Sequence, residues 1–300
     1  MLIKKIWYKL TNQQKYQEYK SMRSLKNSHN FKLIYEPYIN EVMGKISSQK
    51  ELSFLHSGHL GDIINCLPVI KELSKTHKCF LYINTDEPLS TPYANHPASD
   101  VFINNKIFLK LKPLLEAQSY ITNIEKYSSQ KIDVNFDIFR KFPINICFDN
   151  LRYSYHVTGV QPKSDEPYLN VEKHKNVIDK IIIQRTFRYR NKHINYQFLN
   201  DYEEVYFIGT LKEYNDLKND LPKLIHYDCK DFLEMAMIIK SCKIFIGNSS
   251  VGFPIAEALK VPRLLEACPH FPAALPHGKN AFDFFYQKHF ENFFKTLYNK

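Results

Sequence analysis

Short apolar runs alternate with segments of helical periodicity from residue 51 onward. Residues 51–56, ELSFLH, have the character of a short strand, and residues 62–75 place their apolar side chains close to a 3.6-residue period, which predicts a helix. Pro68 lies within this segment, and we expect it to bend or delay the helix rather than lie in its middle. A second strand is predicted at 79–84. This alternation is typical of a parallel, doubly wound α/β sheet.

The same alternation resumes near Val177, after a stretch at 95–150 whose pattern is too weak to predict an element. Strands are expected in VIDKIIIQRT, EVYFIGT and KIFIG, and helices in NYQFLNDY, YNDLKNDL and DFLEMAMIIKSC. A last helix, with phenylalanines on one face, is predicted from about Ala281 to Leu297. We therefore divide the chain into a helical extension at 1–50, α/β domains at 51–172 and 173–275, and a C-terminal helix at 276–300 that packs back on the body.

The composition fits two folded domains and argues against a secreted or membrane-spanning chain. Three hundred residues, 44% of them hydrophobic, suffice for two ordinary α/β cores. No apolar run is long enough to span a bilayer, and the N-terminus lacks the apolar region and cleavage site of a secretory signal. The six cysteines contain no CxxC pair, which argues against a structural zinc site and favours reduced thiols in the cytoplasm.

The formal net charge of +10 is concentrated near the N-terminus. The first fifty residues contain ten Lys or Arg and three Glu, an excess of seven positive charges. Lys4, Lys5 and Lys9 stand beside Trp7 and Tyr8, so this arm could contact an anionic membrane surface or nucleic acid. The alternative is a solvated helix packed beside the folded domains. Because no RNA- or DNA-binding motif accompanies the charge, we expect no nucleic-acid partner.

Glycines mark the loops that follow the predicted strands. Such a loop lets backbone N–H groups approach a ligand closely, and a helix that starts there adds the positive end of its dipole, which together favour an anion. Open α/β sheets bind ligands at the carboxyl ends of their strands, so glycine loops in both domains predict one shared cleft. The alternative is ordinary tight turning. Five of the eight glycines lie in such loops: Gly58, Gly61, Gly209, Gly247 and Gly252.

Two motifs resemble a known family. HSGHLGDIINCLPVIKEL at 56–73 is similar to the N-terminal signature of the ADP-heptose:lipopolysaccharide heptosyltransferase-like enzymes, glycosyltransferase family 9, in which a Gly-Asp pair opens a helix and a proline follows six residues after the Asp. Asp62 and Pro68 keep this spacing. FIGNSSVGFPIAEALKVPRLLE at 245–266 resembles the family's C-terminal donor-binding signature. The resemblance covers roughly 51–275 and implies a GT-B architecture, two Rossmann-like doubly wound domains facing a central cleft, with an inverting reaction and no catalytic metal.

The resemblance implies that Asp62 is the general base. A carboxylate beside the acceptor can take the proton of its hydroxyl group as the anomeric carbon is attacked. The sequence also permits Asp62 to cap the following helix, and the two roles are compatible. His56 and His59 flank the same loop and could assist acceptor binding or proton transfer, or serve as ordinary hydrogen-bonding residues.

The resemblance also implies where the donor binds. The basic loop after the first strand of the second domain corresponds to a loop that contacts the donor phosphates, although its charges could be surface charges. The helix start at 248–252 offers N–H groups and hydroxyls to a diphosphate, and its serines could instead cap the helix. A helix glutamate could bind the ribose or be exposed. The predicted donor-binding residues are Gly61, Arg185, Arg188, Lys192, Gly209, Asn248, Ser249, Ser250, Gly252 and Glu257.

The chain departs from the family at the donor loop, where Ser249 replaces an acidic residue and Pro254 replaces a histidine, so the donor need not be ADP-heptose. We expect an inverting, metal-independent glycosyltransferase without a cofactor. It would move a sugar from a nucleotide-diphosphate sugar to a cell-surface glycan or lipid-linked acceptor, in the cytoplasm or at the inner face of the membrane. One alternative is a UDP-N-acetylglucosamine 2-epimerase-like enzyme, because the segment GNSSVGFPIAEA also resembles the donor loop of those enzymes. The other is a catalytically silent nucleotide-sugar-binding protein.

Overall fold

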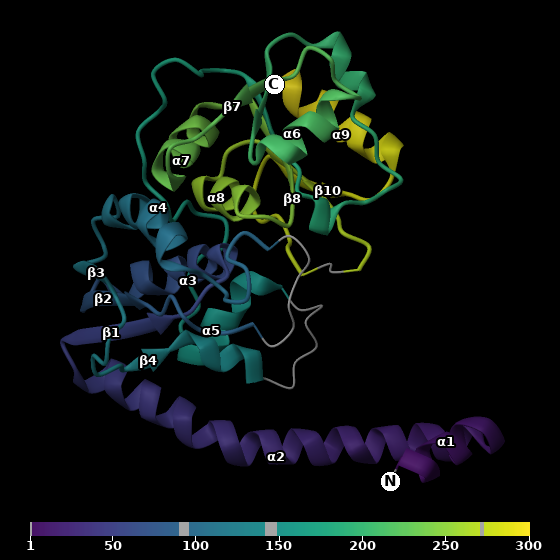
Figure 1. The fold of residues 1–300 in the computed structure, drawn as a ribbon. Coiled ribbons are helices and arrows are strands. Elements are labelled where there is room, and N and C mark those ends of the chain that lie inside the picture. The colour runs from purple at the N-terminus through teal and green to yellow at the C-terminus, as the bar shows by residue number, and fades with distance from the viewer. Residues whose placement is uncertain (1, 90–95, 142–148, 271–272) are drawn as a thin grey trace.

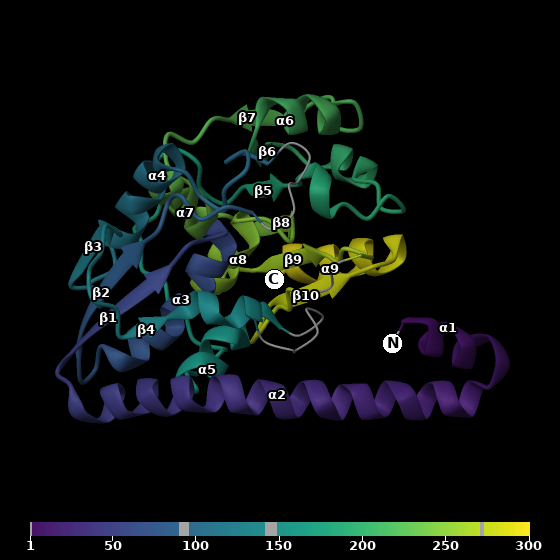
Figure 2. The same cartoon turned by 60° about the horizontal axis from the view of Figure 1, so that its bottom comes forward.

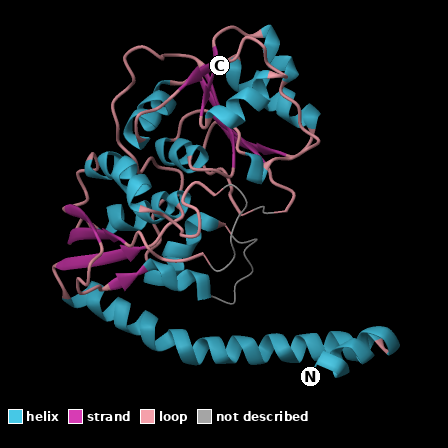
Figure 3. Cartoon of the chain, viewed as in Figure 1, coloured by secondary structure: helices cyan, strands magenta, loops and turns pink. Residues whose placement is uncertain are grey.

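The computed structural model describes residues 2–89, 96–141, 149–270 and 273–300 and contains a parallel β-sheet in each half of the chain (Figures 1 and 3). The N-terminal sheet has the strand order β3-β2-β1-β4, and all neighbours pair in parallel. Its strands are β1 (Glu51–His56), β2 (Lys78–Ile83), β3 (Asn123–Lys126) and β4 (Val134–Asn135). The helices of this half are α3 (Leu60–Leu73), α4 (Asn105–Glu116) and α5 (Tyr153–Thr158).

The C-terminal sheet has the strand order β10-β9-β8-β5-β6-β7 and is also parallel throughout. Counted from β5, this is the Rossmann order 3-2-1-4-5-6, and the N-terminal sheet has its first four strands. The predicted α/β fold class is therefore confirmed. The strands are β5 (Ile181–Gln184), β6 (Val205–Ile208), β7 (Ile225–Tyr227), β8 (Ile244–Asn248), β9 (Arg263–Glu266) and β10 (Ala281–Phe284). The helices are α6 (Leu211–Lys218), α7 (Phe232–Ser241), α8 (Gly252–Leu259) and α9 (Gln287–Tyr298).

One hydrophobic core continues from the N-terminal lobe into the C-terminal lobe. Strands β5 and β8 are buried along their whole length, as expected for central strands of a parallel sheet covered on both faces. Ile182 and Phe245 point to the face that joins the core of the N-terminal lobe through α7 and α8. Ile183 and Ile246 point to the other face, where they pack with α9. The shared core fixes α8 between the two lobes.

Two helices, α1 (Leu2–Thr11) and α2 (Gln13–Ser48), precede the first strand. The C-terminal part of α2 lies against the N-terminal sheet, where Val42 is fully buried and the Tyr35 hydroxyl donates to the carbonyl of Lys141. The Tyr38 hydroxyl donates to the carbonyl of Asn135 (3.0 Å) and accepts from its N–H (2.8 Å). Tyr38 thus bonds both backbone groups of the edge strand β4. The N-terminal part of α2 projects beyond the lobes and carries α1 (Figure 2).

Two predicted elements differ in the structure. Pro68 lies inside α3 rather than at a bend or before the helix. Its missing N–H removes one helical hydrogen bond, but its ring is buried in the core, which offsets that loss. Residues Ala281–Phe284 form strand β10, paired with β9, and not the first turn of a helix. The aromatic rings that suggested one helical face instead stack between the two elements, as Phe284 does on Phe290 of α9.

The weakly patterned stretch 95–150 contains α4, β3 and β4, none of which was predicted. β4 is only two residues long, and β3 exposes three of its four residues, so neither has the apolar run of a buried strand. The short strand β7 was missed for the same reason, since none of its residues is fully buried. NYQFLNDY, predicted as a helix, forms a 3₁₀ helix at Gln197–Asp201.

Candidate functional site

Each sheet has a topological switch point, where neighbouring strands begin crossovers in opposite directions. In the N-terminal sheet this point lies between β1 and β4, and in the C-terminal sheet between β5 and β8. Ligands of open α/β sheets bind in the crevice at the carboxyl ends of such strand pairs. His56 ends β1 and Asp137 follows β4, whereas Gln184 ends β5 and Asn248 ends β8. The candidate site is therefore built from these four strand ends.

The two signature segments lie side by side at the junction of the lobes. A Cβ atom added to Gly61 of α3 would be 3.2 Å from Cγ of Pro254 in α8. Beside this contact, residues of both lobes line a small hollow, among them Asn65, Leu151 and Phe253. The expectation that the loops around Gly61 and Gly252 face a common crevice agrees with this arrangement.

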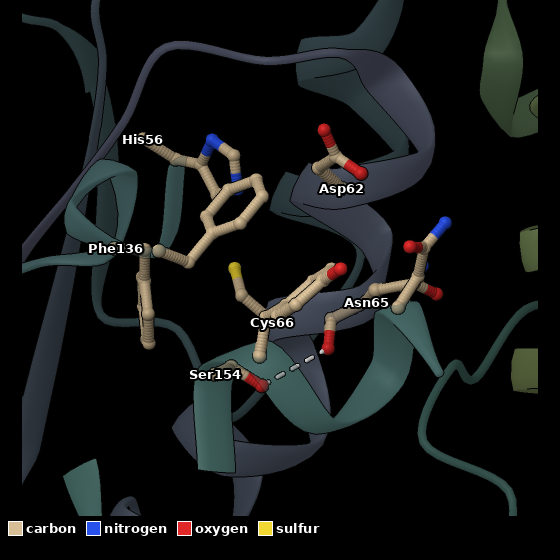
Figure 4. Close-up of a pocket in the computed structure, with 9 residues that line it drawn as sticks. His56, Asp62, Asn65, Cys66, Phe136 and Ser154 are labelled. Carbon is tan, nitrogen blue, oxygen red and sulfur yellow. Dashed lines mark hydrogen bonds between the residues drawn. The ribbon is translucent and has the colours of Figure 1, made fainter. Parts of the chain in front are cut away.

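Asp62 lines a second small hollow, on the N-terminal side of the junction (Figure 4). Its carboxylate lies across the hollow from the ring of His56, and Asn65 and Cys66 follow on the next turn of α3 (Figure 4). One oxygen of Asp62 accepts a hydrogen bond from the backbone N–H of His59 (3.2 Å). Burial raises the pKa of Asp62, and the positive charge of Arg140 offsets part of this rise. Asp62 thus stabilises the start of α3 and also faces a pocket.

Asp137 and Arg140 belong to the same cluster, and sequence reasoning missed both. They lie on the 3₁₀ helix Phe136–Lys141 after β4. Asp137 accepts hydrogen bonds from Arg140, from Ser57 Oγ (2.5 Å) and from the Ser57 N–H (3.1 Å), and it lies 3.4 Å from His56 Nδ1. Burial alone would raise the pKa of Asp137, but His56, Arg140 and Ser57 outweigh it and lower the pKa. Asp137 is therefore ionised and holds the cluster together.

The guanidinium group of Arg140 is sandwiched between two aromatic rings. Its central carbon lies 4.2 Å from the ring centroid of Phe102 and 4.8 Å from that of Phe139. Nη2 lies 3.9 Å from Asp62 Oδ2. This places a fixed positive charge beside the candidate base. No sequence signal marked it, because the surrounding stretch shows no clear periodicity.

His56 is buried and neutral at physiological pH. Burial lowers its pKa to about 4, and Nδ1 accepts a hydrogen bond from the N–H of Gly58 (3.0 Å). The proton of the neutral ring is therefore on Nε2. The two roles proposed for His56, hydrogen bonding in the loop and proton transfer, remain compatible with this tautomer.

Two histidines of the N-terminal lobe, His59 and His96, feel the charge of Arg188 from the C-terminal lobe. Nδ1 of His59 lies 3.3 Å from Nε2 of His96. Burial lowers the pKa of His59 to about 3, with contributions from His96, Arg140 and Arg188. Burial and Arg188 also lower the pKa of His96. Arg188 belongs to the C-terminal lobe, and its electrostatic influence on both histidines indicates that it lies near them; its predicted contact with the donor stays a prediction.

Arg185 lies inside the C-terminal lobe instead. Its Nε and Nη2 donate to the buried carboxylate of Glu266 (2.7 and 3.0 Å), and Nη2 also donates to the carbonyls of Asn191 and Ile194. The hydroxyl of Tyr196 donates to the same carboxylate (2.8 Å). This geometry contradicts the predicted phosphate contact. Arg185 pairs a buried carboxylate and ties the following loop to β9.

The start of α8 differs from the predicted anion site. The N-cap is Val251 and has no side-chain hydrogen bond, so neither Ser249 nor Ser250 caps the helix. The N–H of Gly252 donates to the side chain of Gln184 (2.7 Å), that of Phe253 donates to the carbonyl of Ser250, and Pro254 has no N–H. The first three residues of α8 therefore offer no free backbone N–H group to a ligand.

Gly252 is needed for packing, because a Cβ atom there would lie 2.5 Å from Gln184 Oε1. Asn248 is buried, and its side chain bonds both the N–H and the carbonyl of Thr186 (3.1 and 2.8 Å). Asn248 thus joins the loops after β5 and β8 at the switch point. Its side-chain amide, which was predicted to contact the donor, is used in these bonds to Thr186. Ser249 and Ser250 remain half-buried in the turn that follows.

Glu257 is buried and bonded within the protein. Its carboxylate accepts hydrogen bonds from Arg263 Nε (2.6 Å), from the ammonium group of Lys260 and from the N–H of His277. The interpretation of Glu257 as an exposed residue is therefore wrong, and its contact with a donor ribose stays a prediction. The side chain of His277 in turn lies 2.7 Å from Asp149 Oδ2 of the N-terminal half. This network fastens the end of α8 at the lobe junction.

Two predicted donor residues lie in loops of the C-terminal lobe. Lys192 is exposed. Gly209 has a φ of +156° just before α6, and a Cβ atom there would lie 2.9 Å from the ring of Phe207. Its carbonyl lies 3.0 Å from Nε2 of His226. The tight turn alone accounts for this glycine.

Neither a metal cluster nor a spanning helix is found in the part of the chain that the structure describes. No three His, Cys, Asp or Glu side chains of these residues gather closely enough to hold a metal ion. None of the described helices has both the length and the hydropathy needed to cross a bilayer.

Comparison with known proteins supports the fold. No protein-family model and no curated protein matches the sequence. A glycosyltransferase family 9 protein from Veillonella parvula is 12% identical, with 83% of this chain and 89% of that chain covered and a TM-score of 0.54. ADP-heptose lipopolysaccharide heptosyltransferase II of E. coli is 12% identical over 84% and 99%, with a TM-score of 0.53.

The dodecameric, iron-containing glycosyltransferase TibC of enterotoxigenic E. coli is 13% identical, with 78% of this chain and 62% of that chain covered and a TM-score of 0.50. At such identities the similarity concerns the fold. Together with the two switch points and the contact between α3 and α8, it confirms the resemblance at that level. The chain has the two-lobed GT-B fold of glycosyltransferase family 9.

Proposed function

We propose that the protein is an inverting glycosyltransferase that uses a nucleotide-diphosphate sugar. The observation that carries the proposal is the position of Asp62, a carboxylate with a raised pKa that lines a hollow on the N-terminal side of the junction between two Rossmann-like lobes. A carboxylate with a raised pKa is a stronger base than an exposed one. The fold that this chain shares with family 9 glycosyltransferases supports the same function.

In the proposed reaction an acceptor hydroxyl attacks the anomeric carbon of the donor. Asp62 takes the hydroxyl proton, the new glycosidic bond forms, and the bond to the nucleoside diphosphate breaks. A single displacement of this kind inverts the anomeric configuration. Arg140, 3.9 Å from Asp62, favours its ionised form before the reaction. The residues named need no metal ion for this step.

Among the predicted donor contacts, Arg188 is the residue that best fits the leaving diphosphate. It comes from the C-terminal lobe, and its charge acts on His59 together with that of Arg140 from the N-terminal lobe, so a diphosphate held there would meet positive charge from both lobes. Charge that develops on the leaving oxygen is stabilised most by such fixed donors. Lys192, Ser249 and Ser250 complete the proposed donor set, with Gly209 at its margin.

We propose that the acceptor is a cell-surface glycan or lipid-linked sugar, and that the reaction takes place in the cytoplasm at the inner face of the membrane. E. coli heptosyltransferase II, which shares the fold, is an ADP-heptose lipopolysaccharide transferase. The donor of this chain need not be ADP-heptose, because Ser249 and Pro254 stand where the family signature has an acidic residue and a histidine.

A panel of nucleotide sugars tests the proposal in two steps. The correct donor at large excess should raise the free energy of unfolding by about 3–4 kcal/mol, measured by thermal shift. That donor should then be consumed only when an acceptor is present. Isomerisation of the sugar without an acceptor would favour the epimerase alternative instead. Donor binding without turnover, against glycan and lipid-linked acceptors alike, would support a silent binding protein.

A further inference from the structure

Helix α1 turns its apolar side chains toward solvent. Ile3, Ile6, Trp7 and Leu10 are three and four residues apart, so they line one side of the helix. They are 84%, 49%, 64% and 79% exposed. The opposite side carries Tyr8, whose ring lies against Tyr19 of α2 with 6.4 Å between centroids. A helix on a soluble protein normally packs its apolar side inward, so α1 is oriented to meet an apolar partner.

Helix α2 holds α1 away from the lobes. The residues of α2 that contact the N-terminal lobe begin at Tyr35, whereas the side chains described between Gln13 and Lys32 are largely exposed. A rise of 1.5 Å per residue makes the projecting part of α2 roughly 30 Å long. Figures 1 and 2 both show α1 beside the end of α2 that is farthest from β1. The sequence alternative of a helix packed beside the catalytic body is therefore wrong for α1.

The charge around the apolar stripe has one sign. The first seventeen residues contain Lys4, Lys5, Lys9 and Lys15 and no acidic residue. Lys4 and Lys9 are exposed at the sides of the stripe, and Lys4 lies 5.9 Å from the ring centroid of Tyr8. An apolar stripe with a tryptophan, flanked by lysines, fits the boundary between acyl chains and anionic headgroups.

We propose that α1 is an interfacial membrane helix, which lies in the plane of an anionic bilayer with Ile3, Ile6, Trp7 and Leu10 below the headgroups and its lysines among them. Helix α2 then serves as a spacer between the bilayer and the lobes. The bilayer is inferred as the partner from α1 and α2 alone. This inference touches the proposed function at one point, because a lipid-linked acceptor would lie in the same bilayer.

A second copy of the chain fits the stripe less well than a bilayer. Pairing two α1 helices through four side chains each would bury little area, and helices of ten residues are marginally stable without extensive packing. Lysines of both copies would also flank the seam and repel one another. A bilayer removes the same side chains from water and supplies opposite charge.

Trp7 makes the test direct, because it is the single tryptophan of the chain. The full-length protein is mixed with vesicles of phosphatidylcholine alone or with phosphatidylglycerol added, without any nucleotide sugar. With the anionic vesicles, Trp7 emission should shift to shorter wavelength and be quenched by brominated acyl chains. Because no substrate is present, this result is independent of catalytic activity.

Matched variants identify the surface. The double variant Ile6→Ser/Leu10→Ser keeps Trp7 and should bind anionic vesicles roughly tenfold or more weakly. Lys4→Gln/Lys9→Gln should reduce the dependence on phosphatidylglycerol. Leu109→Ser removes an apolar side chain that is 58% exposed on α4, and it should bind like the parent.

Unchanged Trp7 emission with anionic vesicles would overturn the proposal, as would equal binding by Ile6→Ser/Leu10→Ser. So would a dimer in light scattering that buries Trp7 without lipid and is lost in that double variant, since the occupant would then be a second copy.

Discussion

Gly61 of α3 lies directly against Pro254 of α8, so that a Cβ atom on the glycine would stand 3.2 Å from Cγ of the proline. The two residues come from signatures almost two hundred positions apart and belong to different lobes. Their contact brings the switch point of one Rossmann-like sheet to that of the other. The predictions below follow from the residues around this junction.

Asp62→Asn should abolish most turnover and leave the fold intact. Asn can still accept the hydrogen bond from the His59 N–H, but it cannot take a proton from the acceptor. We expect kcat to fall by about 10² to 10⁴ with donor binding unchanged, measured by product formation and by thermal shift. The control Asp86→Asn removes an exposed carboxylate that pairs with Lys126 and accepts a hydrogen bond from Thr85 Oγ1, and it should retain full activity. Full activity of Asp62→Asn would rule out its role as the base.

Arg188→Gln should weaken donor binding. The loss of a positive charge at the crevice is expected to raise KM for the donor by roughly tenfold and to lower kcat as well, because the leaving group loses stabilisation. Initial rates over a range of donor concentrations measure both constants. Lys288→Gln, at an exposed side chain of α9, serves as the control for a lost surface charge. Equal constants for Arg188→Gln and the parent would exclude this contact.

Arg185→Met should lower stability. It leaves the carboxylate of Glu266 buried without its partner, which typically costs about 3–5 kcal/mol in the free energy of unfolding. Urea denaturation measures the loss, and Arg185→Met/Glu266→Gln should recover part of it. A variant of normal stability with a raised KM for the donor would instead restore the donor-binding role that the sequence suggested.

Gly252→Ala should destabilise the C-terminal lobe. The new methyl group would meet Gln184 Oε1 at 2.5 Å, and Gln184 is itself buried and bonded to the N–H of residue 252. Overpacking of this kind costs about 1–3 kcal/mol. Gly44→Ala is the matched control, because a Cβ atom there meets nothing within 4 Å and the residue lies inside α2. We expect this control to raise stability by about 0.5–1 kcal/mol in the same denaturation assay.

Acid should destabilise the protein through His56. In the folded chain burial lowers its pKa to about 4, against 6.5 for an ordinary histidine. Between these pH values the unfolded chain binds a proton that the folded chain does not, so the free energy of unfolding falls as the pH is lowered. The loss from His56 is roughly 3 kcal/mol across this window. His56→Gln should show a flatter pH dependence in urea denaturation, and an unchanged slope would contradict the assignment.

The strand and helix order could be predicted where apolar periodicity is strong, as in β5, β8 and α3. The signatures also indicated Asp62 and the approach of Gly61 to the second lobe. Asp137 and Arg140 were not predicted because β4, which precedes them, is only two residues long and shows no apolar pattern. Its pairing with β1 joins positions about 80 residues apart in the sequence. Contacts of that range leave no local trace in a single sequence.

Side-chain direction was the second limit. Arg185 and Arg188 are three residues apart in one basic loop and looked equivalent. The backbone turns at Phe187–Tyr189 send one toward Glu266 and leave the other at the crevice. In the same way, nothing local to Glu257 shows that Arg263 and Lys260 close around it. Such pairings are decided by tertiary packing.

The hydroxyl of Tyr38 bonds the backbone of edge strand β4 as a neighbouring strand would, and this makes part of α2 integral to the N-terminal lobe. A chain shortened to begin at the first strand would leave the N–H and carbonyl of Asn135 unpaired on the edge of the sheet. Unpaired sheet edges can pair with strands of other molecules. The N-terminal extension therefore protects the lobe against self-association as well as projecting from it, and shortened forms intended for crystallisation should retain residues from Tyr35 onward.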